Sequence, residues 1–183
     1  MKNFRLIFLI SMLPIIFSWT TRSCKSLDKL TMFHMELVDS AVIPSQIGIN
    51  LPFNIYTPPI RTNSFQVFEN HNTRKDLIEE IKLELLSLRI FAPENSDFSF
   101  LNSIEIYLVP ADKEEILIAW KYDIGNDVGK ELDLELTPDD LTAYIIEDEL
   151  ELHLSTVTDK INLSDIHLEI TAGFFVNAKI LGI

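Results

Sequence analysis

Apolar and polar residues alternate along several short stretches of this chain. The clearest stretch spans residues 102–123, where every second residue is apolar from Ile104 to Leu108 and again from Ile116 to Tyr122. A period of two places these side chains on one face of a β-strand, and the PADKEE segment between the two runs has the composition of a turn. The pattern predicts a β-hairpin whose second strand buries Ile116, Ile118, Trp120 and Tyr122.

The same alternation predicts four further strands, within residues 47–56, 131–137, 149–155 and 166–180. Pro52 has no backbone N–H, so the first of these strands is expected at the edge of a sheet. In the second, ELDLELT, the leucines alternate with acidic residues. One continuous strand is expected there, with its core face formed by Leu132, Leu134 and Leu136.

Two short segments favour helix. Thr73 and Asp76 resemble a capping box, which predicts a helical turn within residues 73–80 that continues into a strand. Thr137 and Pro138 suit the start of a second helix of one or two turns. Together the elements predict an all-β fold, an antiparallel β-sandwich of about six to eight strands with immunoglobulin-like architecture and one or two short helical turns.

The N-terminus has the layout of a secretory signal. Lys2 and Arg5 are followed by the apolar run LIFLISMLPIIF, residues 6–17. A helix of that length spans about 18 Å, short of the roughly 30 Å of a bilayer core, and Pro14 would kink it. The run is therefore expected to direct export and not to span a membrane.

Cys24, the only cysteine of the chain, follows this run closely and comes directly after Ser23. The arrangement resembles the signal of bacterial lipoproteins, in the looser form found in Bacteroidota envelope lipoproteins. The resemblance implies a signal peptide over residues 1–23, a lipid on the Cys24 sulfur, and a cell-envelope protein anchored to the outer membrane. Residues 24–31 would form a tether and 32–183 a single β-sandwich domain. A conventional signal with Cys24 as an incidental thiol is the alternative.

The chain is acidic, with 15 Lys and Arg against 28 Asp and Glu and a formal net charge of −13. Cleavage after Ser23 would remove Lys2, Arg5 and Arg22, which leaves 12 basic residues against 28 acidic ones and a net charge of −16. Nucleic-acid binding depends on Lys and Arg that neutralise phosphates, so nucleic acid is excluded as a partner. Divalent cations and basic partners remain compatible with this charge.

The sequence contains neither a GxGxxG fingerprint, nor a P-loop, nor a GxSxG nucleophile elbow, and it has only five glycines. We therefore expect a non-enzymatic binding or structural-interaction module with no cofactor. Most aromatic side chains are expected in the core. Tyr107, opposite the apolar face of its strand, is the best exposed ring for contact with a protein or glycan partner.

The alternative function is a metal-dependent hydrolase. Glu151 and His153 are two residues apart on the polar face of one predicted strand, and His167 and Glu169 are placed in the same way on another. If the two strands were neighbours in register, the two imidazoles and two carboxylates would suit Zn²⁺. The competing interpretation is a pair of solvated strand faces that hold no ligand.

Overall fold

A computed structural model describes residues 32–45, 52–111 and 113–179 of the chain. The predicted signal peptide, residues 1–23, the lipid-attachment residue Cys24 and the tether, residues 24–31, lie outside these ranges. Within the described ranges, no helix is long and apolar enough to cross a membrane.

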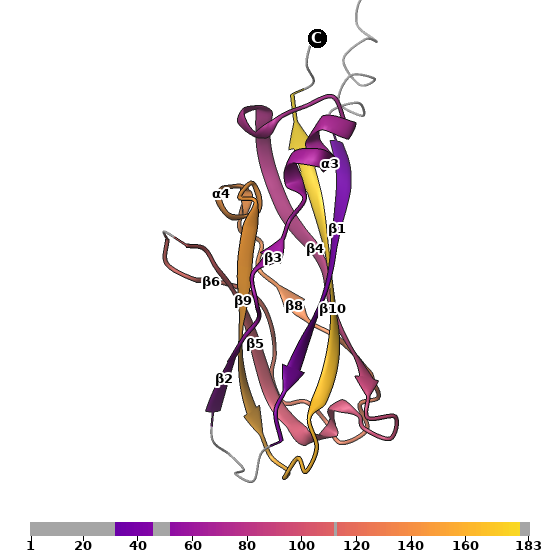
Figure 1. Cartoon of the computed structure of the whole chain (residues 1–183). Coiled ribbons are helices and arrows are strands. Elements are labelled where there is room, and N and C mark those ends of the chain that lie inside the picture. Colours follow the sequence, from indigo (N-terminus) through magenta and orange to yellow (C-terminus); the bar gives the residue numbers. More distant parts are fainter. Residues whose placement is uncertain (1–31, 46–51, 112, 180–183) are drawn as a thin grey trace, which may run out of the picture.

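Two antiparallel sheets stack face to face to form a β-sandwich, as predicted (Figure 1). The four-stranded sheet contains, in spatial order, β1 (Met32–Ile43), β10 (Ile166–Ala178), β4 (Ile78–Ala92) and β7 (Glu131–Asp133). The six-stranded sheet contains, in spatial order, β2 (Pro52–Tyr56), β9 (Glu149–Thr158), β5 (Leu101–Val109), β6 (Ile116–Lys121) and β8 (Glu135–Leu136). Its sixth strand, β3 (Ile60–Arg61), also pairs with β9. Pro52 does lie on an edge strand.

The long strands supply the core through their alternation. Every second side chain of β10, from Ile166 to Ala178, is buried, and β5 follows the same pattern from Ile104 to Leu108. The inward side chains of both sheets form one cluster, whose completely buried members include Ile43, Ile81, Leu88, Ile106, Leu154 and Val176. Burial of this apolar area, at about 25 cal/mol per Å², is the main term that stabilises the sandwich.

The predicted hairpin is confirmed, since β5 and β6 are antiparallel neighbours. The register shifts midway, however, and leaves a bulge at Ile118. Ile118 and Ala119 are both buried, and Trp120 therefore lies opposite Glu105 on the outer face of the sheet. Tyr122 is 49% exposed. The prediction that Trp120 and Tyr122 are buried is wrong, because the extra residue reverses the alternation.

The single strand predicted over residues 131–137 is instead two strands in different sheets. β7 pairs with β4 of the four-stranded sheet, whereas β8 pairs with β6 of the six-stranded sheet. The chain crosses between the sheets at Leu134, whose N–H donates to the carbonyl oxygen of Leu86 at 3.2 Å. Leu132 is buried, and Leu134 and Leu136 are partly buried against the core. All three leucines thus contact the core, Leu132 from β7, Leu136 from β8 and Leu134 from the crossing between them.

The helices are short: α3 (Ser64–Asn70), the 3₁₀ helices η3 (Lys75–Leu77) and η4 (Phe98–Phe100), and α4 (Thr142–Ile145). The helical turn predicted within residues 73–80 is confirmed as η3, which continues into β4. The other predicted helix, α4, begins later than Thr137. Its N-cap residue is Leu141, and the Oδ1 atom of the preceding Asp140 accepts from the N–H of Thr142, the first residue of the helix, at 2.9 Å.

Candidate functional site

A row of three rings crosses the outer face of the six-stranded sheet. Tyr56 of β2 is the register partner of His153 of β9, and His153 is the partner of Tyr107 of β5. The Tyr56 and His153 rings stack with centroids 4.5 Å apart and 10° between their planes. Tyr107 stacks on the other side of His153 at 5.3 Å and 22°. The imidazole is therefore held between two phenol rings.

His153 points away from the core but is only 7% exposed. Besides the two rings, Glu115 lies against it, with Oε2 2.8 Å from the imidazole Nδ1. A carboxylate accepts hydrogen bonds, so this contact assigns the proton of the neutral imidazole to Nδ1 and leaves Nε2 as an acceptor. Nε2 is buried and has no hydrogen-bond partner among the described residues. The expectation of a solvated face is thus wrong at His153.

A second row places carboxylates beside further rings. Glu105 of β5 is the register partner of Trp120 of β6, which is in turn the partner of Glu135 of β8. Glu105 accepts from the hydroxyl groups of Tyr107, at 2.8 Å, and Tyr122, at 2.5 Å. Glu135 accepts from the Trp120 Nε1–H at 3.1 Å. The carboxylates therefore fix the polar ends of the neighbouring rings.

The hydrogen bond to Glu105 raises the pKa of Tyr107 to about 12, and burial and the Glu105 charge act in the same direction. The pKa of Tyr122 is raised as well, chiefly by its own hydrogen bond to Glu105. Both phenols therefore remain protonated donors at neutral pH.

The two rows together form one surface on the outside of the six-stranded sheet. We call it the aromatic–acidic face and define it by Tyr56, Glu105, Tyr107, Glu115, Trp120, Tyr122, Glu135, Glu151 and His153.

The structure does not bring together the four residues considered as a metal site. His153 and Glu151 belong to β9 of the six-stranded sheet, whereas His167 and Glu169 belong to β10 of the four-stranded sheet. Glu169 instead forms an ion pair with Arg89 at 2.8 Å. Across the described residues, no group of three or more His, Cys, Asp or Glu side chains is arranged to hold a metal ion.

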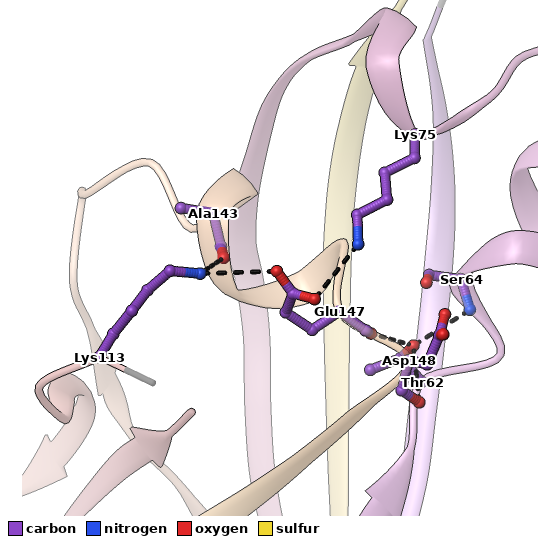
Figure 2. Close-up of polar contacts among 7 residues, drawn as sticks. All are labelled: Thr62, Ser64, Lys75, Lys113, Ala143, Glu147 and Asp148. Carbon is purple, nitrogen blue, oxygen red and sulfur yellow. Dashed lines mark hydrogen bonds and ion pairs between the residues drawn. The ribbon is translucent and has the colours of Figure 1, made fainter. Parts of the chain in front are cut away.

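A polar cluster next to α4 joins three separate segments of the chain (Figure 2). Glu147 accepts from the Lys75 ammonium at 3.2 Å and lies 3.5 Å from that of Lys113, which also donates to the Ala143 carbonyl oxygen at 2.6 Å. The hydrogen bond from Lys75 and the charges of both lysines lower the pKa of Glu147. An open hollow of about 610 Å³ adjoins the cluster and is lined by Pro110, Ala111, Lys113 and residues 147–149. Since Lys75, Lys113 and Glu147 already satisfy one another, we interpret the cluster as structural.

Several residues of the aromatic–acidic face were not predicted as site residues. Tyr107 was expected to be exposed, and it is half-buried on the outer face. Tyr56 and Trp120 come from other strands, and the sequence does not reveal which strands are neighbours. One signal was available: β5, β8 and β9 have glutamates at outward positions, β2 and β5 have tyrosines there, and none of these four strands contains lysine or arginine.

No family model matches the sequence, and no curated protein matches it. Solved structures that match in fold include the decameric BFDV capsid protein, with 7% identity, a TM-score of 0.37, and 81% of this chain and 99% of that chain covered. Turnip yellow mosaic virus matches with 10% identity, a TM-score of 0.29, and 82% and 84% covered. A carbohydrate-binding module of the β-sandwich superfamily matches with 12% identity, a TM-score of 0.26, and 84% and 58% covered. These similarities concern the β-sandwich fold alone.

Proposed function

We propose that this protein is an envelope-anchored, non-enzymatic binding module and that the aromatic–acidic face is its binding surface. Cys24 would carry the lipid anchor and tether the sandwich to the outer membrane. The observation that carries the proposal is the grouping of Tyr56, Trp120 and Tyr122 on one outward face, with 56% and 49% of the two tyrosines exposed. Exposed rings with fixed orientations are typical of surfaces that recognise a ligand.

The hydrogen bonds of the face support binding over catalysis. Glu105 and Glu135 each hold a ring in place, and Glu115 holds His153. A hydrolase needs a nucleophile or a metal-bound water together with a base free to take its proton. In the proposed module these carboxylates instead keep the rings in position. The separation of His153 from His167 also argues against the metal-dependent hydrolase.

Site-specific photo-crosslinking in cells that make the full-length protein tests the binding surface. A benzophenone side chain at position 56 lies on the aromatic–acidic face, and one at position 91 replaces the half-exposed Phe91 of the four-stranded sheet. We expect a discrete set of adducts from position 56 and none from position 91. Adducts of equal yield from both positions, or from neither, would contradict the assignment of the surface.

A further inference from the structure

The carboxylates of the aromatic–acidic face lack basic partners. Among the described residues, neither Glu105, Glu115, Glu135 nor Glu151 forms an ion pair with lysine or arginine, whereas Glu79, Glu80, Glu147, Glu149 and Glu169 all do. The strands of this sheet contain one lysine and one arginine. Lys121 of β6 has the inward-facing Ile104 as its register partner, and Arg61 of β3 is the register partner of Glu149 and forms an ion pair with it at 3.7 Å. The face therefore carries negative charge that the fold leaves uncompensated.

The rings stand beside this charge. Tyr56 lies on the edge strand β2. One side of its ring covers His153, and none of the described strands is paired with β2 on the other side. Trp120 and Tyr122 lie next to Glu105 and Glu135. A guanidinium group stacks on aromatic rings and forms paired hydrogen bonds with carboxylates, so it uses both kinds of group at once. An ammonium group does not stack on aromatic rings in this way and cannot form the same paired hydrogen bonds with a carboxylate.

A separate observation also indicates a ligand that donates hydrogen bonds. His153 is more than nine-tenths buried in the centre of the face, and its Nε2, which is an acceptor in the neutral imidazole, has no partner in the described part of the chain. An unpaired buried acceptor is unfavourable, and a donor N–H from a ligand would satisfy it. Tyr56, whose ring stacks on His153, is 56% exposed, so a ligand that contacts this ring comes next to the buried imidazole.

We infer that the aromatic–acidic face binds an arginine-bearing, cationic segment of a protein partner. The inference rests on the proposed function and adds the chemistry of the ligand. The net charge of the whole chain, −13, assists by attracting such a segment from a distance. Neutral glycans also stack on aromatic rings and donate hydroxyl hydrogen bonds to carboxylates, but they carry no positive charge that would compensate the carboxylates of this face.

Binding of fluorescein-labelled nona-arginine to the full-length protein in detergent, followed by fluorescence anisotropy, tests the inference. We expect the double variant Glu105→Gln, Glu151→Gln to bind at least tenfold more weakly than the unchanged protein. The matched control is Glu36→Gln, Asp133→Asn, which removes the same charge from exposed positions of β1 and β7 in the other sheet. We expect the control to bind within twofold of the unchanged protein. Equal weakening by both pairs would show diffuse attraction and overturn the inference.

The contribution of the rings is tested separately. Tyr56→Ser should weaken nona-arginine binding several-fold and Tyr56→Phe should not, because phenylalanine keeps the ring and the Tyr56 hydroxyl is not needed for stacking. Nona-lysine should bind several-fold more weakly than nona-arginine. Equal affinity for both peptides, unchanged by Tyr56→Ser, would overturn the inference.

Fluorescein-labelled neutral oligosaccharides, whose binding is followed directly by the same method, distinguish the inference from the proposed function. Suppose that the oligosaccharides bind, that Tyr56→Ser abolishes their binding, and that nona-arginine does not bind. The inference then fails, whereas the proposed binding surface stands. If nona-arginine does not bind and position 56 gives no crosslinks in cells, both fail.

Discussion

Tyr56 and His153 stack across the β2–β9 pair with 4.5 Å between their ring centroids, although both side chains point away from the hydrophobic core. The contact places a buried imidazole on the outer face of a sheet, where the sequence pattern indicates a solvated residue. With Tyr107 and Glu115 it forms a small polar-aromatic layer outside the main core.

His153→Ala should lower the free energy of unfolding by about 1–3 kcal/mol, because it removes a buried ring and leaves the Glu115 carboxylate without its hydrogen-bond donor. The measurement is urea unfolding of the full-length protein, followed by circular dichroism. His167→Ala is the matched control: His167 is part-exposed on the outer face of the other sheet, so its loss should cost no more than about 0.5 kcal/mol. Equal effects of the two substitutions would contradict the buried position of His153.

Ile106→Ala should lower the free energy of unfolding by about 2–5 kcal/mol, since Ile106 is completely buried and its loss leaves a cavity. Its register partners Ala119 and Leu154 are also completely buried and cannot move outward to fill the space. Val38→Ala, at a position that is 53% exposed, is the control and should change the free energy of unfolding by less than about 1 kcal/mol. A loss at Ile106 as small as that at Val38 would place this hairpin outside the core.

Glu105→Gln should lower the pKa of Tyr107 from about 12 towards the ordinary value near 10, because the amide accepts a weaker hydrogen bond and carries no charge. Titration of phenolate absorbance measures this change, with Glu36→Gln as a control that should leave the curve unaltered. The raised pKa also has a consequence for stability. The unfolded chain releases the Tyr107 proton first, so the contribution of this bond is fully present below pH 10 and is lost as the pH rises towards 12.

Cys24→Ala should leave an uncut precursor or a protein released from the membrane, because the substitution removes the sulfur that would carry the lipid. Ser26→Ala, two residues further on, should leave anchoring unchanged. Intact-mass measurement of protein extracted from membranes checks the modification directly. A free Cys24 thiol in that fraction would refute the lipid anchor.

The strands that the sequence predicts well are those whose alternation is unbroken, such as β9 and β10. The differences between the predicted and the observed elements have physical causes that the local pattern of apolar and polar residues does not reveal. The bulge at Ile118 reverses the outward and inward positions of β6, and the crossing at Leu134 divides one alternating run between two sheets. Helix α3 is preceded by Asn63, a common N-cap residue, but here its φ is 51° and its side chain makes no capping hydrogen bond. β1 was not predicted, although its inward positions alternate.

The candidate site was less accessible to sequence reasoning than the fold. Tyr56, Tyr107 and His153 belong to three strands that are far apart along the chain, and only the pairing of β2, β9 and β5 brings them into one row. The same pairing keeps His153 away from His167. A side chain's neighbours across a sheet depend on strand order and register, which the period of two along each strand does not determine.

The crossing at Leu134 makes the two long sides of the sandwich unequal. On one side, β7 and β8 are consecutive pieces of the same chain in different sheets, so the sheets are joined there by a single residue. On the other side, the edge strands β1 and β2 end the two sheets and are separated in sequence by residues 44–51. Partial opening of the sandwich should therefore begin between β1 and β2. Backbone amides of β2, beside Tyr56, are then expected to exchange with solvent deuterium earlier than those of β5 in the same sheet.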